Sequence, residues 1–137
     1  MSAFRFAVTA TISTFAAAAA AALFFLIAVP AAAQPAQQVV VQVWSFGFGP
    51  QPIRLAAGKP VTLTFANQSG SSHDFVAPGF FQRARIVAGA APLGMIDLRG
   101  HETKTITLIP AAGTYEAHCS HFLHKQMGMS DQIIVSP

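Results

Sequence analysis

The chain has 137 residues, which is enough for one ordinary domain. It carries 8 Lys and Arg against 5 Asp and Glu, a net charge of +3, without any run of basic residues. The sequence therefore has no basic patch of the kind that nucleic-acid binding requires. A disulfide within the chain is excluded, because there is only one cysteine.

The N-terminal segment predicts a secretory signal peptide over residues 1–33. Arg5 precedes an uncharged stretch, residues 6–29, made mostly of Ala, Phe, Leu and Ile. The small residues at 31–33 form the A-x-A pattern that a signal peptidase needs. The alternative is a retained anchor facing the periplasm, because the apolar stretch is close to the roughly 20 residues that span a bilayer. We therefore expect an exported, periplasmic protein whose single domain occupies residues 34–137.

Export makes the lone cysteine informative. Removing the leader takes away only Arg5 among the charged residues, which lowers the net charge from +3 to +2. In an oxidising compartment Cys119 must be buried, paired with another chain or held by a metal.

The remainder of the chain predicts strands. Apolar or β-branched residues alternate with polar ones, and Gly, Pro, Asn and Ser fill the gaps between these runs. The expected strands are residues 39–44, 61–65, 104–108, 114–119 and 132–135. Many short strands separated by turns indicate an all-β protein, either an antiparallel sandwich or a small barrel.

Residues 80–98 break this pattern. They alternate poorly and contain Pro92 and two glycines, so we expect a short helix around residues 81–87 and an irregular loop after it. Phe80 and Phe81 are expected in the core.

Metal-binding residue types concentrate in residues 118–129, HCSHFLHKQMGM. In the strand that leads into this run, Cys119 shares its side with the apolar residues Tyr115 and Ala117, so its side chain should point inward. His118 has the opposite parity and should face solvent. The loop that follows returns the chain to its last strand.

This loop can bring Cys119, His124 and one methionine to a common point. A second histidine must come from elsewhere, and His73 follows a Gly/Ser turn at the start of a strand-like stretch. One thiolate, two imidazoles and a weak thioether are the ligands of a type 1 copper centre. The sequence therefore predicts a copper site at one end of the fold.

Two segments carry a family resemblance. Residues 113–129, GTYEAHCSHFLHKQMGM, and residues 57–75, AGKPVTLTFANQSGSSHDF, resemble the cupredoxins, the plastocyanin- and azurin-like small blue copper proteins. The closing IIV is similar to them as well. The resemblance implies a Greek-key β-sandwich that holds one type 1 copper ion.

Carried over by position, the resemblance implies the ligands His73, Cys119, His124 and Met129. Met127 stays as an alternative axial ligand, because some relatives have a shorter spacing between the histidine and the methionine.

Each of the first two ligands is followed by a polar residue. Asp74 and Ser120 look like the positions whose hydrogen bonds tie the two ligand loops together and orient the ligands. Many relatives have Asn where this chain has Asp74.

Four further residues near the expected site are assigned by position. Phe122 and Leu123 lie in the ligand loop, where they are core residues by default or else an apolar docking surface around His124. His118 and His121 are expected to be exposed residues on the rim of the site.

The expected function is to carry single electrons between exported redox partners by Cu(I)/Cu(II) cycling. The alternative is a periplasmic copper-binding or trafficking protein without redox cycling, and a sandwich without metal is the third possibility. Enzyme activity is not expected, because four protein ligands leave no open position for a substrate. The expected partner is a redox protein rather than a nucleic acid.

Overall fold

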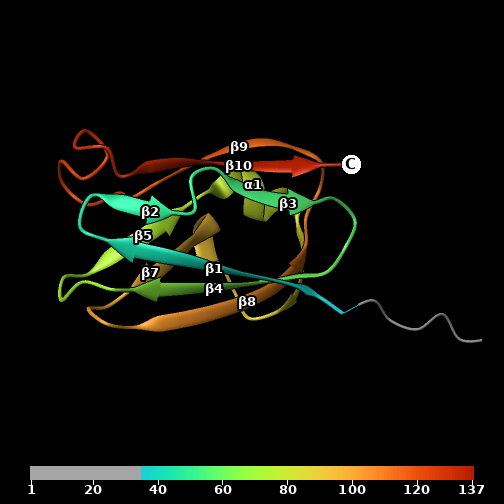
Figure 1. Cartoon of the computed structure of the whole chain (residues 1–137), viewed down its shortest axis with the longest axis horizontal. Coiled ribbons are helices and arrows are strands. Elements are labelled where there is room, and N and C mark those ends of the chain that lie inside the picture. Colours follow the sequence, from blue (N-terminus) through green and yellow to red (C-terminus); the bar gives the residue numbers. More distant parts are fainter. Residues whose placement is uncertain (1–34) are drawn as a thin grey trace, which may run out of the picture. The chain divides into compact units, whose positions relative to one another are not determined.

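The computed structural model describes residues 35–137, which form two β-sheets packed on each other (Figure 1). The expected leader, residues 1–33, lies outside the described residues. Within residues 35–137, no helix has the length and apolar character needed to cross a membrane.

Each sheet has five strands, and the chain passes repeatedly from one sheet to the other. The first sheet has the order β2-β1-β4-β8-β6, formed by Gly47–Gly49, Gln37–Trp44, Val61–Asn67, Thr103–Ile109 and Arg85–Ala88. The second has the order β3-β10-β9-β5-β7, formed by Ile53–Ala56, Ser130–Ser136, Gly113–His118, His73–Val76 and Met95–Leu98. Only the pairs β1–β4 and β3–β10 are parallel among these strands. The expected all-β Greek-key sandwich is confirmed.

Strand β4 shows why the alternating sequence folds in this way. Its residues are alternately buried and half-buried, with Val61, Leu63 and Phe65 inside and the two threonines outside. Across the pair β4–β8, the hydroxyls of Thr62 and Thr107 are hydrogen bonded at 3.0 Å and those of Thr64 and Thr105 at 3.3 Å. Such cross-strand pairs stabilise the register in which the apolar face is buried.

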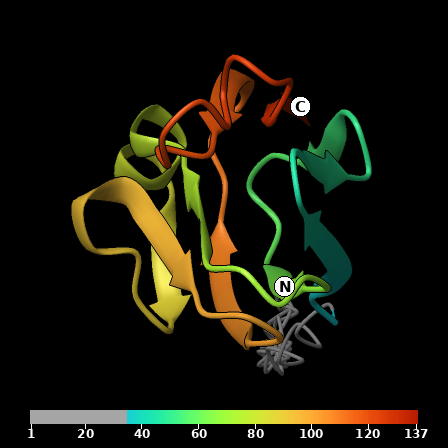
Figure 2. The same cartoon turned by 90° about the vertical axis from the view of Figure 1, so that its left-hand side faces the viewer.

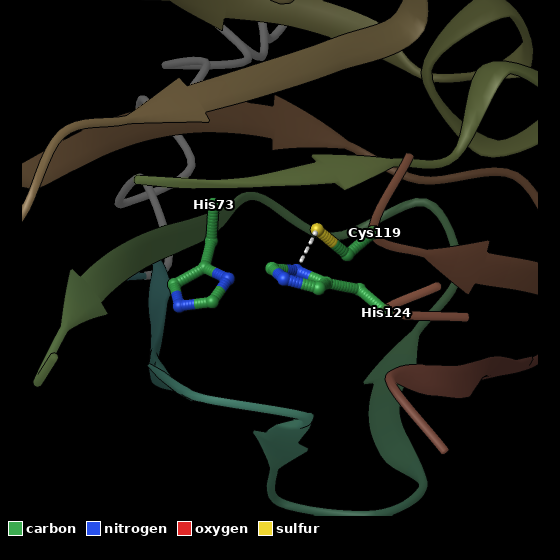
Figure 3. Close-up of side chains that lie close together, drawn as sticks. All are labelled: His73, Cys119 and His124. Carbon is green, nitrogen blue, oxygen red and sulfur yellow. Dashed lines mark hydrogen bonds between the residues drawn. The ribbon is translucent and has the colours of Figure 1, made fainter. Parts of the chain in front are cut away.

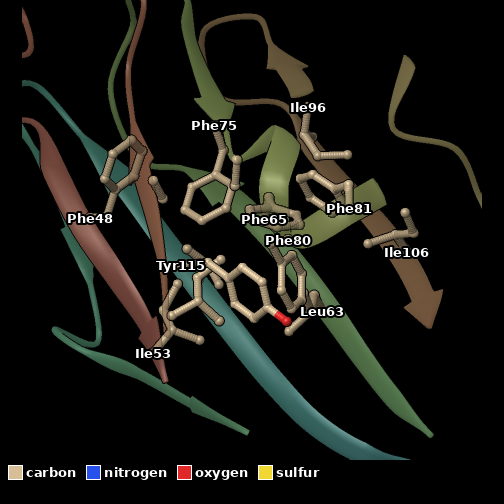
Figure 4. Close-up of a cluster of buried hydrophobic side chains, with 14 of the residues drawn as sticks. Phe48, Ile53, Leu63, Phe65, Phe75, Phe80, Phe81, Ile96, Ile106 and Tyr115 are labelled. Atoms are coloured by element: carbon tan, nitrogen blue, oxygen red, sulfur yellow. The ribbon is translucent and has the colours of Figure 1, made fainter. Parts of the chain in front are cut away.

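The core is rich in phenylalanine, and Phe75 packs among several of these rings (Figure 4). The centroid of its ring is 4.9 Å from that of Phe65, 5.2 Å from that of Phe48 and 6.5 Å from that of Phe81. Phe75 belongs to β5, the strand that begins at His73. Its packing therefore fixes the position of that histidine relative to both sheets.

Residues 80–98 are more regular than predicted. Helix α1, Pro78–Arg83, begins three residues before the expected helix, because Pro78 is well suited to a first turn. It buries Phe80 and Phe81, as expected. The helix ends at Arg83, and residues 85–87, which were expected in it, belong to strand β6. The expected irregular loop contains the 3₁₀ turn η1 (Pro92–Gly94) and strand β7.

The half-buried carboxylate of Asp131 allows a test of stability. Asp131 in β10 accepts a hydrogen bond from the backbone of Gln132 at 2.7 Å through Oδ1, but its buried Oδ2 has no hydrogen-bond partner among residues 35–137. Burial raises the pKa of Asp131 to about 6, and the Gln132 hydrogen bond opposes this shift. A raised folded-state pKa means that this group's stabilisation is complete below the unfolded pKa near 3.8 and is lost as the pH rises through about 6.

We therefore expect Asp131→Asn to stabilise the metal-free protein at neutral pH. The full pKa shift of Asp131 would correspond to about 3 kcal/mol in the free energy of unfolding. Because the side chain is partly exposed to solvent, we expect a gain of about 1 kcal/mol. Urea unfolding at pH 7 and pH 4 measures the effect, and the difference between variant and wild type should disappear at the lower pH. An equal difference at both pH values would mean that ionisation of Asp131 is not the cause.

Candidate metal centre

The residues predicted to bind metal gather at one end of the described sandwich, where β5 begins and β9 ends (Figure 1). Figure 2 views this end directly. One nitrogen of His73, one nitrogen of His124 and the sulfur of Cys119 all lie within 4.8 Å of one another. Figure 3 shows the two imidazoles and the thiol turned toward a common point.

His73 is the first residue of β5 and is buried. Its Nε2 is hydrogen bonded to Ser69 Oγ at 3.0 Å, whereas its buried Nδ1 has no hydrogen-bond partner among residues 35–137. Burial, followed by the nearby His124 and His121, lowers the pKa of His73, and Asp74 opposes that effect. The imidazole is therefore favoured in its neutral form, with one nitrogen free to bind a metal.

Cys119 follows β9 directly and is completely buried, as its strand parity predicts. Its Sγ lies 3.4 Å from Nδ1 of His124. Burial raises the pKa of the Cys119 thiol, and hydrogen bonds from the backbone of Asp74 and His121 act in the opposite direction. A metal ion that binds here must displace the thiol proton, so binding competes with protonation.

The loop that carries His124 is closed by backbone hydrogen bonds. The N–H of Met129 donates to the carbonyl of His124 at 2.9 Å, and the N–H of Cys119 donates to the carbonyl of Met129 at 3.1 Å. Met129 is fully buried, whereas Met127 is 57% exposed. Of the two candidate axial ligands, only Met129 therefore lies inside the protein.

Asp74 and Ser120 join the two segments that carry the ligands. The backbone N–H of Ser120 donates to Oδ1 of Asp74 at 2.6 Å, and the Ser120 hydroxyl donates to Oδ2 of the same carboxylate. Asp74 is only 3% exposed. This bidentate contact places the residue after His73 against the residue after Cys119.

The other two histidines near the site, His118 and His121, lie outside the donor cluster. His121 is exposed, but its ring stacks on His124 with centroids 5.4 Å apart and lies 6.2 Å from the ring of His73. The expectation that His118 is exposed is wrong: it is half-buried and lines a separate pocket with Lys125 and Asp131.

Phe122 and Leu123 are not core residues. They are 87% and 46% exposed, because the loop that carries them stands at the surface of the sandwich. The default expectation of burial is wrong, and the alternative, an apolar surface near His124, agrees with their positions.

Two contacts of the site were missed from the sequence. Ser69 holds His73, and Phe46 packs edge-on against His124 with ring centroids 5.3 Å apart. Neither residue stands at a diagnostic spacing from the ligands, so the sequence contains no signal for them.

The donor set suits copper. A thiolate is soft enough for Cu(I), and imidazole is a good ligand for copper in either oxidation state. The unpartnered Nδ1 of His73 is an independent sign that this cluster fits a metal ion, because buried polar atoms are normally satisfied. The residues therefore fit one copper ion.

Comparison with known proteins agrees with this geometry. Residues 16–135 match the family described as Cupredoxin-like domain. The chain is a cupredoxin. No curated protein matches the sequence of this cupredoxin.

Solved structures share its fold. Reduced auracyanin from the photosynthetic bacterium Roseiflexus castenholzii aligns with a TM-score of 0.56 and 20% identity, over 74% of this cupredoxin and 98% of that chain. Auracyanin A from Chloroflexus aurantiacus, described as a "blue" copper protein, aligns with a TM-score of 0.51 and 21% identity. The alignment covers 72% of this cupredoxin and 99% of auracyanin A. A multicopper oxidase from Campylobacter jejuni has a TM-score of 0.60 and 11% identity, over 80% of this chain but 32% of the oxidase.

The contact between Asp74 and Ser120 should be important for stability. We expect Asp74→Ala to lower the free energy of unfolding of the metal-free cupredoxin by about 3 kcal/mol, because it removes two hydrogen bonds to a buried carboxylate. Denaturant unfolding measures the loss. Asp74→Asn is the matched control: it keeps an oxygen for the Ser120 N–H and should lose clearly less. Equal losses in the two variants would contradict a role for the retained hydrogen bond.

Proposed function

We propose that this cupredoxin is a single-electron carrier with a type 1 copper ion held by His73, Cys119 and His124, and by Met129 as axial ligand. The observation that carries the proposal is the convergence of one sulfur and two imidazole nitrogens within 4.8 Å at the end of the sandwich. The burial of Met129 supports its assignment as the axial ligand in preference to Met127.

The protein environment suits electron transfer. Bound copper would supply the chemistry by alternating between Cu(I) and Cu(II). His73 is held by Ser69, and the segment after Cys119 by Asp74, so these side chains need little rearrangement when the charge of the site changes. Four protein donors leave no open position for a substrate, which argues for a carrier and against an enzyme.

Electrons would enter and leave through His124. This histidine is half-buried, and the apolar residues Phe46, Phe122 and Met127 are exposed on its loop or beside its ring. Such a patch suits the brief docking of a redox protein partner, because it can be desolvated without leaving charges unpaired. We further propose that this exchange takes place outside the cytoplasm, in the periplasm, on the strength of the leader-like N-terminal sequence.

Visible spectroscopy tests the copper centre. The Cu(II)-loaded protein should be intensely coloured by charge transfer from the Cys119 thiolate, and the colour should disappear and return through repeated cycles of reduction and oxidation. Cys119→Ser should abolish the band, whereas the control Met127→Leu should keep it, because Met127 is exposed. A colourless Cu(II) complex would exclude the type 1 assignment, and a band lost after one cycle would exclude a carrier.

A second candidate function is the transfer of copper to other proteins. The observation that favours it is a surplus imidazole: the ring of His121 stacks on that of His124 and is exposed to solvent. With the exposed thioether of Met127 in the same loop, it could receive Cu(I) as the ion leaves the buried donors.

Chelator competition separates the two functions. For copper transfer, the double variant His121→Ala, Met127→Leu should release Cu(I) to a chelator about tenfold more slowly, because the exposed donors that receive the ion are removed; about tenfold is the lower end of the effects of changing groups beside a metal site. Its visible band should be unchanged. Gln126→Ala, an exposed change in the same loop, is the control. Equal release rates in all three proteins would leave electron transfer as the function of the site.

A further inference from the structure

A chain of hydrogen bonds runs from His73 into the opposite sheet. Nε2 of His73 is 3.0 Å from Oγ of Ser69, and that hydroxyl lies 2.9 Å from Oδ1 of Asn67. The backbone N–H of Ser69 donates to the same Oδ1 at 3.0 Å. Asn67 is the last residue of β4 in the first sheet, whereas His73 begins β5 in the second.

The orientation of the Asn67 side chain is fixed by its partners. Its Nδ2 lies 2.7 Å from the carbonyl oxygen of Ser71 and 2.8 Å from that of Arg99. Carbonyl oxygens only accept hydrogen bonds, so the nitrogen of the amide must be the atom that faces them. Oδ1 therefore faces Ser69 and can only accept.

This orientation favours one of the two neutral tautomers of His73. The Ser69 hydroxyl has one hydrogen, and the two atoms placed to receive it, Oδ1 of Asn67 and the carbonyl of Ser71 at 3.2 Å, are both acceptors. When the hydroxyl donates to either of these acceptors, its oxygen accepts from His73, and Nε2 is then the donor. The neutral imidazole consequently keeps its lone pair on Nδ1, the buried atom without a partner.

The turn that carries Ser69 is held in place by close packing. A Cβ atom on Gly100 would lie 2.2 Å from the carbonyl oxygen of Gly70, so the backbones of the two turns approach too closely for any side chain at this position. The N–H of His101 also donates to the carbonyl of Ser69 at 2.9 Å. Ser69 is thus fixed before any metal binds.

We infer that Ser69 is a positioning residue, which locks His73 as the Nε2–H tautomer and presents Nδ1 to the copper ion, with Asn67 as the anchor of the hydroxyl. The part that concerns copper rests on the proposed function of the site. The part that concerns the tautomer is a property of the metal-free protein and can be tested independently. In this arrangement the His73 side chain would not need to rotate when copper binds.

Two variants of the same shape provide the test. Ser69→Thr keeps the hydroxyl, and Ser69→Val replaces it by a methyl group. Nitrogen-15 NMR of the metal-free protein, above the pKa of His73, should show the Nε2–H tautomer in wild type and Ser69→Thr and a mixture of tautomers in Ser69→Val. Competition for Cu(I) with a colorimetric chelator should show an affinity 10- to 100-fold weaker in Ser69→Val, the range typical for loss of a hydrogen bond to a ligating histidine. Ser69→Thr should lie within about threefold of wild type.

Ser71→Ala is the control for disturbance of the turn, because the Ser71 hydroxyl makes no hydrogen bond among residues 35–137 whereas its backbone takes part in the network. It should resemble wild type in both measurements. An Nε2–H tautomer in Ser69→Val, or equal Cu(I) affinities for the Val and Thr variants, would overturn the inference. Failure of the proposed function would instead appear as the absence of the visible band in wild type, which leaves the tautomer measurement unaffected.

Discussion

The site depends on one buried carboxylate. Strands β5 and β9 share a single paired position, Val76 with His118, so their backbones are not joined by a ladder at the end where the ligands lie. Asp74 replaces that ladder by accepting two hydrogen bonds from Ser120, a residue 46 positions away in the sequence. A carboxylate held in this way keeps two ligand-bearing segments at a fixed separation, which backbone pairing alone does not achieve here.

Rigidity of the site is a consequence of the core beneath it. Phe75 is packed among aromatic rings of the first sheet and of helix α1, and it is two residues from His73 on the same strand. Because side chains two apart in a strand project on the same side, the packing that holds Phe75 also sets the direction of His73. The hydrogen bond between His73 and Ser69 and that between Asp74 and Ser120 then hold the first two residues of this short strand in place.

The loop after Cys119 combines two opposite environments. Its two ends, Cys119 and Met129, are buried and joined by a backbone hydrogen bond, whereas Phe122 and Met127 between them are exposed. A loop anchored in this manner can keep a metal-binding sulfur away from water and still present an apolar surface a few residues from it. Both proposed functions use this arrangement, and they differ in whether electrons or copper ions cross that surface.

The sequence by itself determined the central strands, the burial of Cys119 and the spacing of the donors around it. Every strand it missed, β2, β3, β6 and β7, lies at the edge of a sheet, where strands are short and pair on one side only, so their residues need not alternate. Only the tertiary structure decided that Phe122 is exposed and that Ser69 holds His73. Exposure and hydrogen bonding depend on which segments meet in space, and the folding of the two sheets, rather than any local pattern, brings these segments together.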